Sequence, residues 1–369
     1  MSDKRKSNFD VGKPLPNMLA DANKKPDLKP RPLEVQKKPF SWKRAIIYSV
    51  LVIAILFVAA IGWLSYKFQA NCAKVFNDCT IFSLLDSTPL KGESTGRVNI
   101  LLAGNSVDDP GHSGGQLTDS IMLISLNTRN HTGYMLSIPR DLHVMIPGQG
   151  YGKINAVYEY AGMDGLKQVV SQDFGVPINY YALISYNAFR DSVNAVGGID
   201  VTINSPDGRL YDPNKDWSTN GPLVDLPNGT HHLNGEQALD LARTRGDPNP
   251  YGIPVGFEKS DYQRTEDQRM MLVALKTKAT SFGTLFNPIA LGKLLDAVGK
   301  NVQTDFSGNN IHHLASIVKA TPNANLKSVG LNDVNGKNYL MSYGGDLAPA
   351  AGVTDFSQIQ AYVAQLNQQ

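Results

Sequence analysis

A run of twenty residues without a single charge, Ala45 to Leu64, constrains the fold of this chain more than any other feature. At about 1.5 Å rise per residue, a helix of that length spans the roughly 30 Å hydrocarbon core of a bilayer. A cleaved secretory signal is the alternative, but its apolar segment is about 7–15 residues long and lies at the extreme N-terminus. Because this run begins only after residue 44, we expect a retained transmembrane helix over residues 45–66.

Basic residues flank the apolar run unequally. Four of them precede it closely, whereas only Lys67 closely follows it. Since cytoplasmic flanks carry the excess of Lys and Arg, we expect a cytoplasmic N-terminus and an extracellular C-terminal part of a single-pass membrane protein. Residues 1–44 are rich in Lys and Pro and poor in large apolar residues, which predicts a disordered basic cytoplasmic tail that suits anionic membrane lipid.

The charge of the rest of the chain argues against nucleic-acid binding. Residues 1–44 hold twelve Lys/Arg and five Asp/Glu, a net +7, so the +2 of the whole chain leaves −5 for the remainder. A broad basic face, which nucleic-acid binding requires, is therefore not expected in the main domain.

Residues 67–96 are predicted to form an extracellular stalk that contains both cysteines of the chain, Cys72 and Cys79. In an oxidising exterior the two can close a small disulfide loop, and the alternative is a pair of free thiols. Two cysteines alone carry no metal-site signature.

Strand and helix signals alternate from Arg97 onward. Short runs rich in β-forming residues occur at 98–103, 120–126, 132–138, 180–184 and 199–203. Helical patterns occur at 164–174, 186–196, 235–244, 261–281, 288–298, 311–319 and 356–366. This alternation predicts an α/β sandwich around a central sheet. Asn234 is a candidate N-cap, and Gly197-Gly198 a stop signal.

Acidic residues gather in a glycine-rich loop that follows the first predicted strand. Asp108 and Asp109 lie inside the loop, and Asp119 directly precedes the next strand. Carboxylates in this setting suit Mg²⁺, which takes hard oxygen ligands and keeps several waters. An acidic surface turn is the alternative, because Asp and Gly dominate turns in any protein.

Three further stretches combine arginines with carboxylates or amides. Arg140 and Asp141 follow a strand, and Arg243 and Arg245 are predicted to end an amphipathic helix. In the last stretch, three polar residues share one face of a predicted helix: Asp261, Arg264 and Gln268. Each has a simpler explanation as a surface ion pair, a helix-terminal cation or a solvated face. Several arginines in one α/β domain nevertheless indicate a phosphate site, because guanidinium groups bind phosphate bidentately.

Taken together and in order, these stretches resemble the LytR–CpsA–Psr family of bacterial cell-wall assembly proteins. The matching motifs are NILLAG, TDSIMLISL, SIPRDLHV, KINAVYEYAG, NAVGGIDV, LNGEQALDLARTR and DYQRTEDQR, over roughly residues 97–280. The resemblance implies an α-β-α sandwich with a central mixed sheet, with residues 97–285 as the catalytic core and 286–369 as the C-terminal part of the same extracellular domain. It also implies Mg²⁺-dependent transfer of a phosphoglycosyl polymer from a polyprenyl-pyrophosphate carrier to a peptidoglycan hydroxyl.

The resemblance assigns roles to individual residues. Asp119 matches the family's Mg²⁺-associated aspartate, with Asp108 and Asp109 as further metal candidates. The pyrophosphate-binding positions are matched by Arg140, Arg243, Arg245, Asp261, Arg264 and Gln268. Asp119 and Asp141 are the candidates for accepting the proton of the attacking hydroxyl, which makes Asp119, Arg140 and Asp141 the expected catalytic set.

Three positions depart from the family pattern. Ser106 stands where the family usually has an aspartate, Asp108 stands where it has an arginine, and Asp267 stands where it often has a second arginine. Ser106 keeps open a non-catalytic protein that binds polyprenyl pyrophosphate or cell wall. Hydrolysis of the same lipid pyrophosphate also stays open beside the transferase, because it needs the same arginines and metal.

Overall fold

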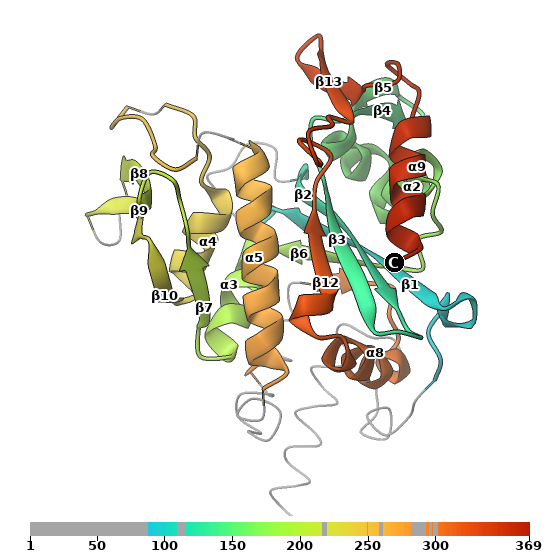
Figure 1. Cartoon of the computed structure of the whole chain (residues 1–369), viewed down its shortest axis with the longest axis horizontal. Coiled ribbons are helices and arrows are strands. Elements are labelled where there is room, and N and C mark those ends of the chain that lie inside the picture. The colour runs from blue at the N-terminus through green and yellow to red at the C-terminus, as the bar shows by residue number, and fades with distance from the viewer. Residues whose placement is uncertain are drawn as a thin grey trace, which may run out of the picture. The chain divides into compact units, whose positions relative to one another are not determined.

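The computed structural model describes residues 88–108, 116–215, 220–248, 250–257, 261–281 and 302–369, together with Lys293, Leu294 and Ala297. At its centre is a six-stranded sheet (Figure 1) with the strand order β11-β6-β1-β2-β3-β12. Its strands are β1 (Arg97–Asn105), β2 (Thr118–Asn127), β3 (Thr132–Ile138), β6 (Tyr180–Ser185), β11 (Val302–Thr304) and β12 (Leu326–Val329).

The sheet is mixed. The pairs β1–β2, β2–β3 and β6–β11 are antiparallel, whereas β1–β6 and β3–β12 are parallel. The expected α/β class with a central mixed sheet between helices is confirmed, and the neighbouring strands β2 and β3 form a hairpin. β12 comes from the C-terminal part of the chain and completes the sheet beside β3.

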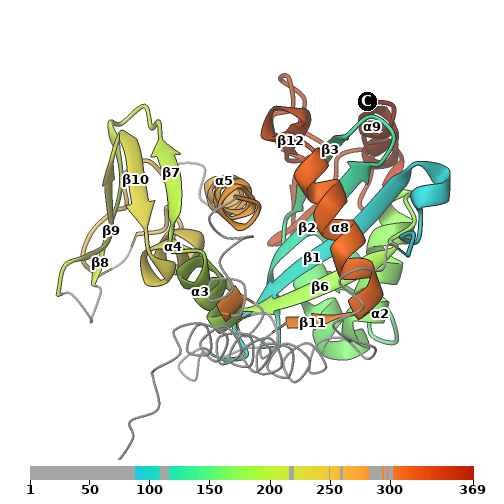
Figure 2. The same ribbon diagram turned by 90° about the horizontal axis from the view of Figure 1, so that it is seen from below.

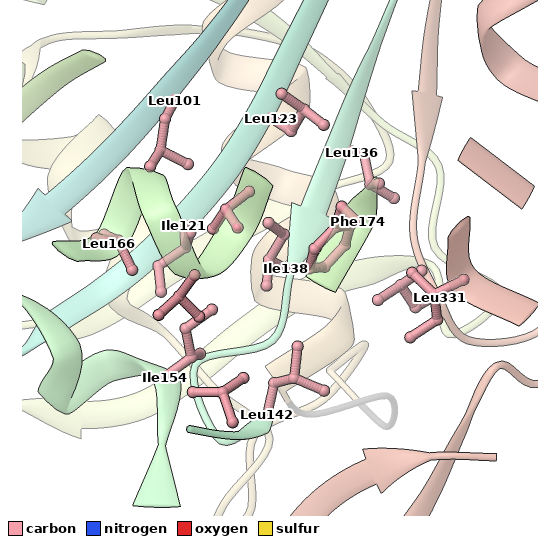
Figure 3. Packing of buried hydrophobic residues seen from close by; sticks show 14 of the residues in the cluster. Leu101, Ile121, Leu123, Leu136, Ile138, Leu142, Ile154, Leu166, Phe174 and Leu331 are labelled. Atoms are coloured by element: carbon pink, nitrogen blue, oxygen red, sulfur yellow. The ribbon is translucent and has the colours of Figure 1, made fainter. Parts of the chain in front are cut away.

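The two faces of the sheet have different partners, which explains why β1 and β2 are apolar at consecutive positions. Side chains alternate between faces along a strand. Leu101, Leu123 and Leu136 pack on one face against α2 (Val157–Phe174) and α9 (Ser357–Asn367). Figure 3 shows these leucines with Leu166 and Phe174 of α2. The intervening residues face the opposite side, where α8 (Gly308–Ala320) crosses the strands in Figure 2.

A second hydrophobic core lies on the far side of α5 (Asp261–Ala279) from the central sheet (Figures 1 and 2). It is built from α3 (Tyr186–Ala195), β7 (Ile199–Ile203), β8 (Arg209–Lys215), β9 (Pro222–Pro227), β10 (Gly229–Leu233) and α4 (Gly235–Arg243). β8 and β9 pair as an antiparallel hairpin within residues 204–228. Helix α5 packs on α4 and β7 and also reaches β3, so it joins the two cores.

Local sequence signals account for the start of α4 and the end of α3. Asn234 caps α4 in a capping box with Gln237, and α3 stops before Gly197 and Gly198, whose φ angles are +82° and +91°. Such left-handed conformations are tolerated by glycine because it lacks a Cβ. The predicted helix over 164–174 is longer than expected, since α2 begins at Val157 and kinks at Gly162.

Two short hairpins lie at the end of the sheet where β3 stops. They are β4 (His143–Ile146) with β5 (Gly150–Lys153), and β13 (Leu340–Tyr343) with β14 (Asp346–Pro349). The backbone N–H of Asn155, just after β5, donates to the carbonyl of Arg140, and that of Leu347 in β14 donates to the carbonyl of Asp141. These hydrogen bonds hold the segment that follows β3.

Several predicted segments lie outside the described residues: the tail over 1–44, the transmembrane helix over 45–66, and Cys72 with Cys79. No helix among the residues that the structure describes has the length and apolarity needed to cross a membrane. Residues 88–96, predicted as the end of the stalk, pack on the domain, because Leu90 is buried with Val98 and Ile100 and the hydroxyl of Tyr180 accepts from the N–H of Lys91.

Candidate active site

A large apolar cavity lies on the face of the sheet opposite α2. Its volume is about 980 Å³. Along β2 its lining runs from Ser120 to Leu126, which at about 3.3 Å per residue is a length of roughly 20 Å. The apolar lining comes from the sheet, α5 and α8, and includes Ile100, Leu102, Met122, Ile124, Ala182, Ile184, Leu272, Leu275, Ile311, Leu314 and Val318. A cavity this long and apolar suits a flexible hydrocarbon chain.

Polar residues gather in the cavity lining where β1 ends and β2 begins. Asp119 and Ser120 contribute from β2, beside Gly104 of β1, and Arg264 and Gln268 contribute from α5. Arg243, Thr244 and Arg245 contribute from the end of α4. The structure therefore brings together five of the predicted site residues in one lining: Asp119, Arg243, Arg245, Arg264 and Gln268.

Arg140 stands beside this lining and is held by carboxylates. Its Nη1 donates to Oδ1 of Asp119 over 2.7 Å, and its Nε lies 3.9 Å from Asp141 and 4.0 Å from Asp261. Burial lowers the pKa of Arg140, but the hydrogen bond with Asp119 and the charges of the three carboxylates outweigh it, so the pKa is raised overall. Arg140 is therefore a fixed cation at the rim of the cavity.

Arg264 is the most deeply buried of the site arginines, at 3% exposure. Its Nη2 donates to the carbonyl of Asp119 over 3.0 Å and lies 2.6 Å from Oδ1 of Asp261. Burial lowers its pKa, and the charges of Arg245 and Arg140 act in the same direction against the attraction of Asp261. Holding like charges beside a buried guanidinium costs stability, and an anionic ligand would offset that cost.

Two guanidinium nitrogens of the site arginines take no part in this hydrogen-bond network. Nε of Arg140 and Nε of Arg264 are buried and have no hydrogen-bond partner within the described parts of the chain. Buried donors are almost always satisfied in folded proteins, and an exception in a cleft calls for a ligand. A phosphate group supplies several charged acceptors and matches the planar geometry of arginine.

Gln268 ties the site to its surroundings. Its Oε1 accepts from Oγ of Ser120 over 2.8 Å, and its Nε2 donates to the carbonyl of Ala242 over 3.0 Å. The amide thereby links β2, α5 and α4 at the polar end of the cavity. Ser120 was not singled out from the sequence, because a single serine in a strand has no distinguishing pattern.

The two arginines near α4 differ from the sequence prediction in one respect. Arg243 is the last residue of α4, and its Cζ lies 4.9 Å from the ring centroid of Tyr186. Arg245 lies beyond the helix, because Thr244 is its extended C-cap. In the region that the structure describes, Arg245 forms no hydrogen bond or ion pair, which leaves its charge for a ligand in the cavity.

The loop after β1 was predicted to hold metal ligands. Oδ2 of Asp108 accepts from the backbone N–H of Asn187 at the start of α3, over 2.8 Å, so one oxygen of this carboxylate binds a helix N-terminus. The other, Oδ1, is buried without a hydrogen-bond partner, as are Oδ1 of Asn105 and Oγ of Ser106. Asp109 lies outside the described residues.

These oxygens bear on whether the residues fit a cation. Among the described residues, no three His, Cys, Asp or Glu side chains lie close enough together to hold a metal. Mg²⁺ needs fewer, since one or two carboxylates with waters and phosphate oxygens complete its octahedron. The unsatisfied oxygens of Asn105, Ser106 and Asp108 lie at and after the end of β1, which pairs with the start of β2 where Asp119 lies, and they are compatible with that smaller requirement.

Asp267, another departure from the family pattern, lies away from the cavity lining. It is buried, its Oδ1 accepts from Nε2 of Gln263, and burial raises its pKa to about 7. Arg269 also points elsewhere, because Nε donates to Ser328 of β12 and Nη1 donates to Ser137 of β3. Neither residue replaces a site arginine.

Comparison with known proteins agrees with this geometry. The LytR_cpsA_psr family matches residues 71–351. The chain belongs to this family. A relative from Bacillus cereus, polyisoprenyl-teichoic acid–peptidoglycan teichoic acid transferase TagU, is 30% identical over 278 residues, which are 72% of this chain and 80% of TagU. The TagT enzyme of the same description from Bacillus subtilis is 32% identical over 222 residues, 60% of this chain and 62% of TagT.

Solved structures show the same fold. The structure described as TagT bound to LI-WTA superposes with a TM-score of 0.56 at 25% identity, covering 74% of this chain and 91% of that one. The LytR_cpsA_psr resemblance drawn from the motifs is thereby confirmed. In this chain the family's arginine motifs converge on one end of the apolar cavity.

Proposed function

We propose that this protein transfers a phosphoglycosyl polymer from a polyprenyl-pyrophosphate carrier to a hydroxyl of peptidoglycan. One observation carries the proposal: an apolar cavity of about 980 Å³ ends at a cluster of arginines. A prenyl chain buried in the cavity places its pyrophosphate against Arg243, Arg245 and Arg264, with Arg140 beside them. The relatives TagU and TagT are named as transferases that move teichoic acid from a polyisoprenyl carrier to peptidoglycan.

The reaction follows from this placement. The acceptor hydroxyl attacks the phosphorus next to the sugar, the bond from that phosphorus to the bridging oxygen breaks, and polyprenyl phosphate leaves. Phosphoryl transfer depends mainly on positioning and on stabilising charge on the phosphoryl oxygens. Nε of Arg140 and Nε of Arg264, both buried and without partners in the described chain, are placed to donate to those oxygens.

A carboxylate must take the proton of the acceptor hydroxyl. Asp119 lines the cavity, whereas Asp141 does not and is engaged with Lys153 over 2.7 Å. Asp119 is therefore the better placed base, and Asp141 is a positioning residue near Arg140. Asp261, which pairs with Arg264, orients that guanidinium rather than binding phosphate itself.

Mg²⁺ is part of the proposal. Asp119 and Asp108 are the described carboxylates that would hold it, with Asp109 as a further candidate. When bound, the ion offsets the negative charge of the diphosphate. The unsatisfied oxygens of Asn105, Ser106 and Asp108 support a cation in this region.

Membrane attachment through residues 45–66 is also part of the proposal. It rests on the uncharged run from Ala45 to Leu64 and on the basic residues before it. A domain held at the outer face of the membrane meets a lipid-linked donor by diffusion in two dimensions. The cysteines Cys72 and Cys79 fall in the segment that would join the anchor to the domain.

Turnover by the full-length chain in detergent tests the proposal. The protein receives a synthetic polyprenyl-pyrophosphoryl glycan and soluble peptidoglycan strands, with and without Mg²⁺, beside the variants Arg140→Ala and Asp119→Ala. Metal-dependent transfer that both variants lose is the expected result. Release of glycan phosphate into water regardless of acceptor would identify a hydrolase instead, and donor binding without turnover would identify a non-catalytic binding protein.

A further inference from the structure

The β4–β5 hairpin has one buried side and one side open to solvent. Val144 and Ile146 of β4 are buried in the main core. On the open side, His143 pairs across the hairpin with Lys153, and Met145 pairs with Tyr151. Met145 and Tyr151 are 50% and 55% exposed. Exposed large side chains gathered on one strand face, rather than scattered singly, mark an interaction surface.

The neighbouring hairpin extends this surface. Tyr343 of β13 is 45% exposed and meets the ring of His143 edge-on, at 5.2 Å between centroids. The other ring contact of His143 is a parallel stack on Tyr151 at 5.4 Å. We call His143, Met145, Tyr151 and Tyr343 the tyrosine face.

A contact with the β13–β14 hairpin fixes the orientation of the tyrosine face. Nδ1 of His143 lies 2.8 Å from Oδ2 of Asp346, the residue paired with Tyr343 across the β13–β14 hairpin. One ring face of Tyr151 is covered by His143, so its exposed area lies on the opposite ring face. An aromatic ring held rigidly with one face open binds a ligand at little cost in side-chain entropy.

The tyrosine face is continuous with the proposed active site. Lys153, at its edge, reaches Oδ1 of Asp141 over 2.7 Å and Oδ1 of Asp346 over 3.8 Å. Oδ2 of Asp141 lies 3.9 Å from Nε of Arg140, the guanidinium assigned above to the reacting phosphate. A chain molecule lying on the tyrosine face would therefore reach the phosphate at Arg140.

We propose that the tyrosine face binds the glycan strand of the peptidoglycan acceptor. The inference rests on the proposed function and adds to it the place where the acceptor lies. One face of a hexose ring carries mainly C–H bonds, so it packs on an aromatic ring and removes apolar area from water. The hydroxyl and acetamido groups at the ring edges need polar partners, which Lys153, Asp141 and Asp346 supply around the aromatic centre.

Exposed aromatic residues can also bind a lipid surface, so a membrane is the alternative ligand of the tyrosine face. The charged groups at the edge of the tyrosine face favour the glycan, because Asp141 and Asp346 would be brought against lipid headgroups and the hydrocarbon boundary at a cost in desolvation. The contact with Arg140 favours it too, since the acceptor hydroxyl must approach the phosphate there.

The test compares Tyr151→Ala and Tyr343→Ala, singly and together, with Tyr151→Phe and with Tyr251→Ala. Tyr251 is a matched control, 52% exposed, on the loop that pairs with β8 on the other side of α5. The full-length chain is assayed for the KM of soluble peptidoglycan strands, for kcat at saturating strands, and for donor affinity. Calorimetric binding of the same strands, and of anionic phospholipid vesicles, is measured without donor.

Each alanine variant is expected to raise the acceptor KM about tenfold, as for an aromatic residue central to an interface. kcat at saturation and donor affinity should stay at the wild-type values, Tyr151→Phe should keep the wild-type KM, and Tyr251→Ala should change nothing. An unchanged acceptor KM in the double variant would overturn the inference while leaving the transferase intact. So would a loss of vesicle binding with strand binding retained.

Failure of the proposed function is separable from failure of this inference. If the wild-type chain transfers nothing, calorimetry alone decides: strand binding that is lost in the double variant and kept in Tyr251→Ala supports the tyrosine face. A wild-type chain that binds no strands refutes it.

Discussion

Nη1 of Arg140 and Oδ1 of Asp119 lie 2.7 Å apart, and through this pair the segment after β3 is tied to the first residues of β2. The carboxylate thereby fixes the guanidinium whose Nε remains without a partner among the described residues. Such an arrangement prepares a cation for a ligand before the ligand arrives, which is where catalytic electrostatics gain most.

Substitution of Arg140 tests this arrangement. Arg140→Lys keeps the charge but loses the planar fork, and Arg140→Ala loses both. We expect kcat/KM for the donor to fall by about a hundredfold or more in both variants, as when a preorganised donor to a developing charge is removed. Steady-state transfer kinetics give the values. Arg129→Ala, in the β2–β3 turn at the other end of the hairpin, is the control, and full activity of Arg140→Ala would contradict the assignment.

A bulky residue in the cavity should discriminate between donors by tail length. Ala182 of β6 lines the cavity beside Leu102. Ala182→Trp places an indole where the hydrocarbon chain is proposed to lie, so affinity for a long-chain polyprenyl donor should fall at least about tenfold, the order expected when a well-packed apolar contact is lost. A donor whose tail is a single isoprene unit serves as the control in the same binding assay, because Ala182 lies beside Leu102, only two residues or about 7 Å along β1 from Gly104 at the polar end. Equal losses for both donors would argue against a lipid channel.

Titration of Asp267 should make the stability of the fold depend on pH. Its pKa is raised to about 7 by burial, whereas an unfolded aspartate titrates near 4. Between these pH values the folded chain holds a proton that the unfolded chain has released, so rising pH lowers the free energy of unfolding, by on the order of 4 kcal/mol in total. The loss should be complete above about pH 8.

Asp267→Asn removes the titration while keeping the shape. Urea unfolding from pH 4 to pH 8 should show a flatter profile for this variant, with its advantage over wild type growing as the pH rises. Asp164→Asn, at an exposed position of α2, should keep the wild-type profile. Parallel profiles for Asp267→Asn and wild type would show that Asp267 is ionised in the folded protein.

Ser106→Asp tests the proposed Mg²⁺ site without an activity assay. Ser106 is fully buried, so an aspartate there buries a charge and should lower the melting temperature by about 5–10 °C in the absence of metal. Millimolar Mg²⁺ should restore most of this loss, because the cation pairs with the new carboxylate. Ser106→Asn introduces a side chain of the same size as aspartate but without charge, so its melting temperature should fall and should not recover with Mg²⁺. If Mg²⁺ raises the melting temperature of neither variant, the region around Ser106 does not bind the metal.

Much of the fold was predictable because its signals are local. β1, β2 and β3 are apolar runs separated by turn residues, and α4 carries its cap at Asn234. The four-residue strands β4, β5, β13 and β14 are too short to show a period, so their hairpins were not predicted. The pairing of β12 with β3 joins segments nearly two hundred residues apart, and no local pattern records such a contact.

In the candidate site, too, residues in local motifs were predictable, whereas contacts that depend on the tertiary structure were not. Asp119, Arg243, Arg245, Arg264 and Gln268 stand in recognisable motifs, and they share the cavity lining. The binding of Asp108 to the N–H of Asn187 depends on where α3 begins in space, and no spacing in the sequence shows it. The stacking of His143 on Tyr151 depends likewise on the register of a hairpin.

The alternation of side chains along β1 and β2 has a consequence for how such proteins diversify. Leu101 and Leu123 hold the sheet to α2, whereas Leu102 and Met122, one position away, line the cavity. Substitutions of Leu101 or Leu123 lower the stability of the fold, whereas substitutions of Leu102 or Met122 change the shape of the cavity proposed to hold the lipid. A lineage can therefore change which carrier it accepts by altering every other residue of two strands, and leave the architecture that displays the arginines untouched.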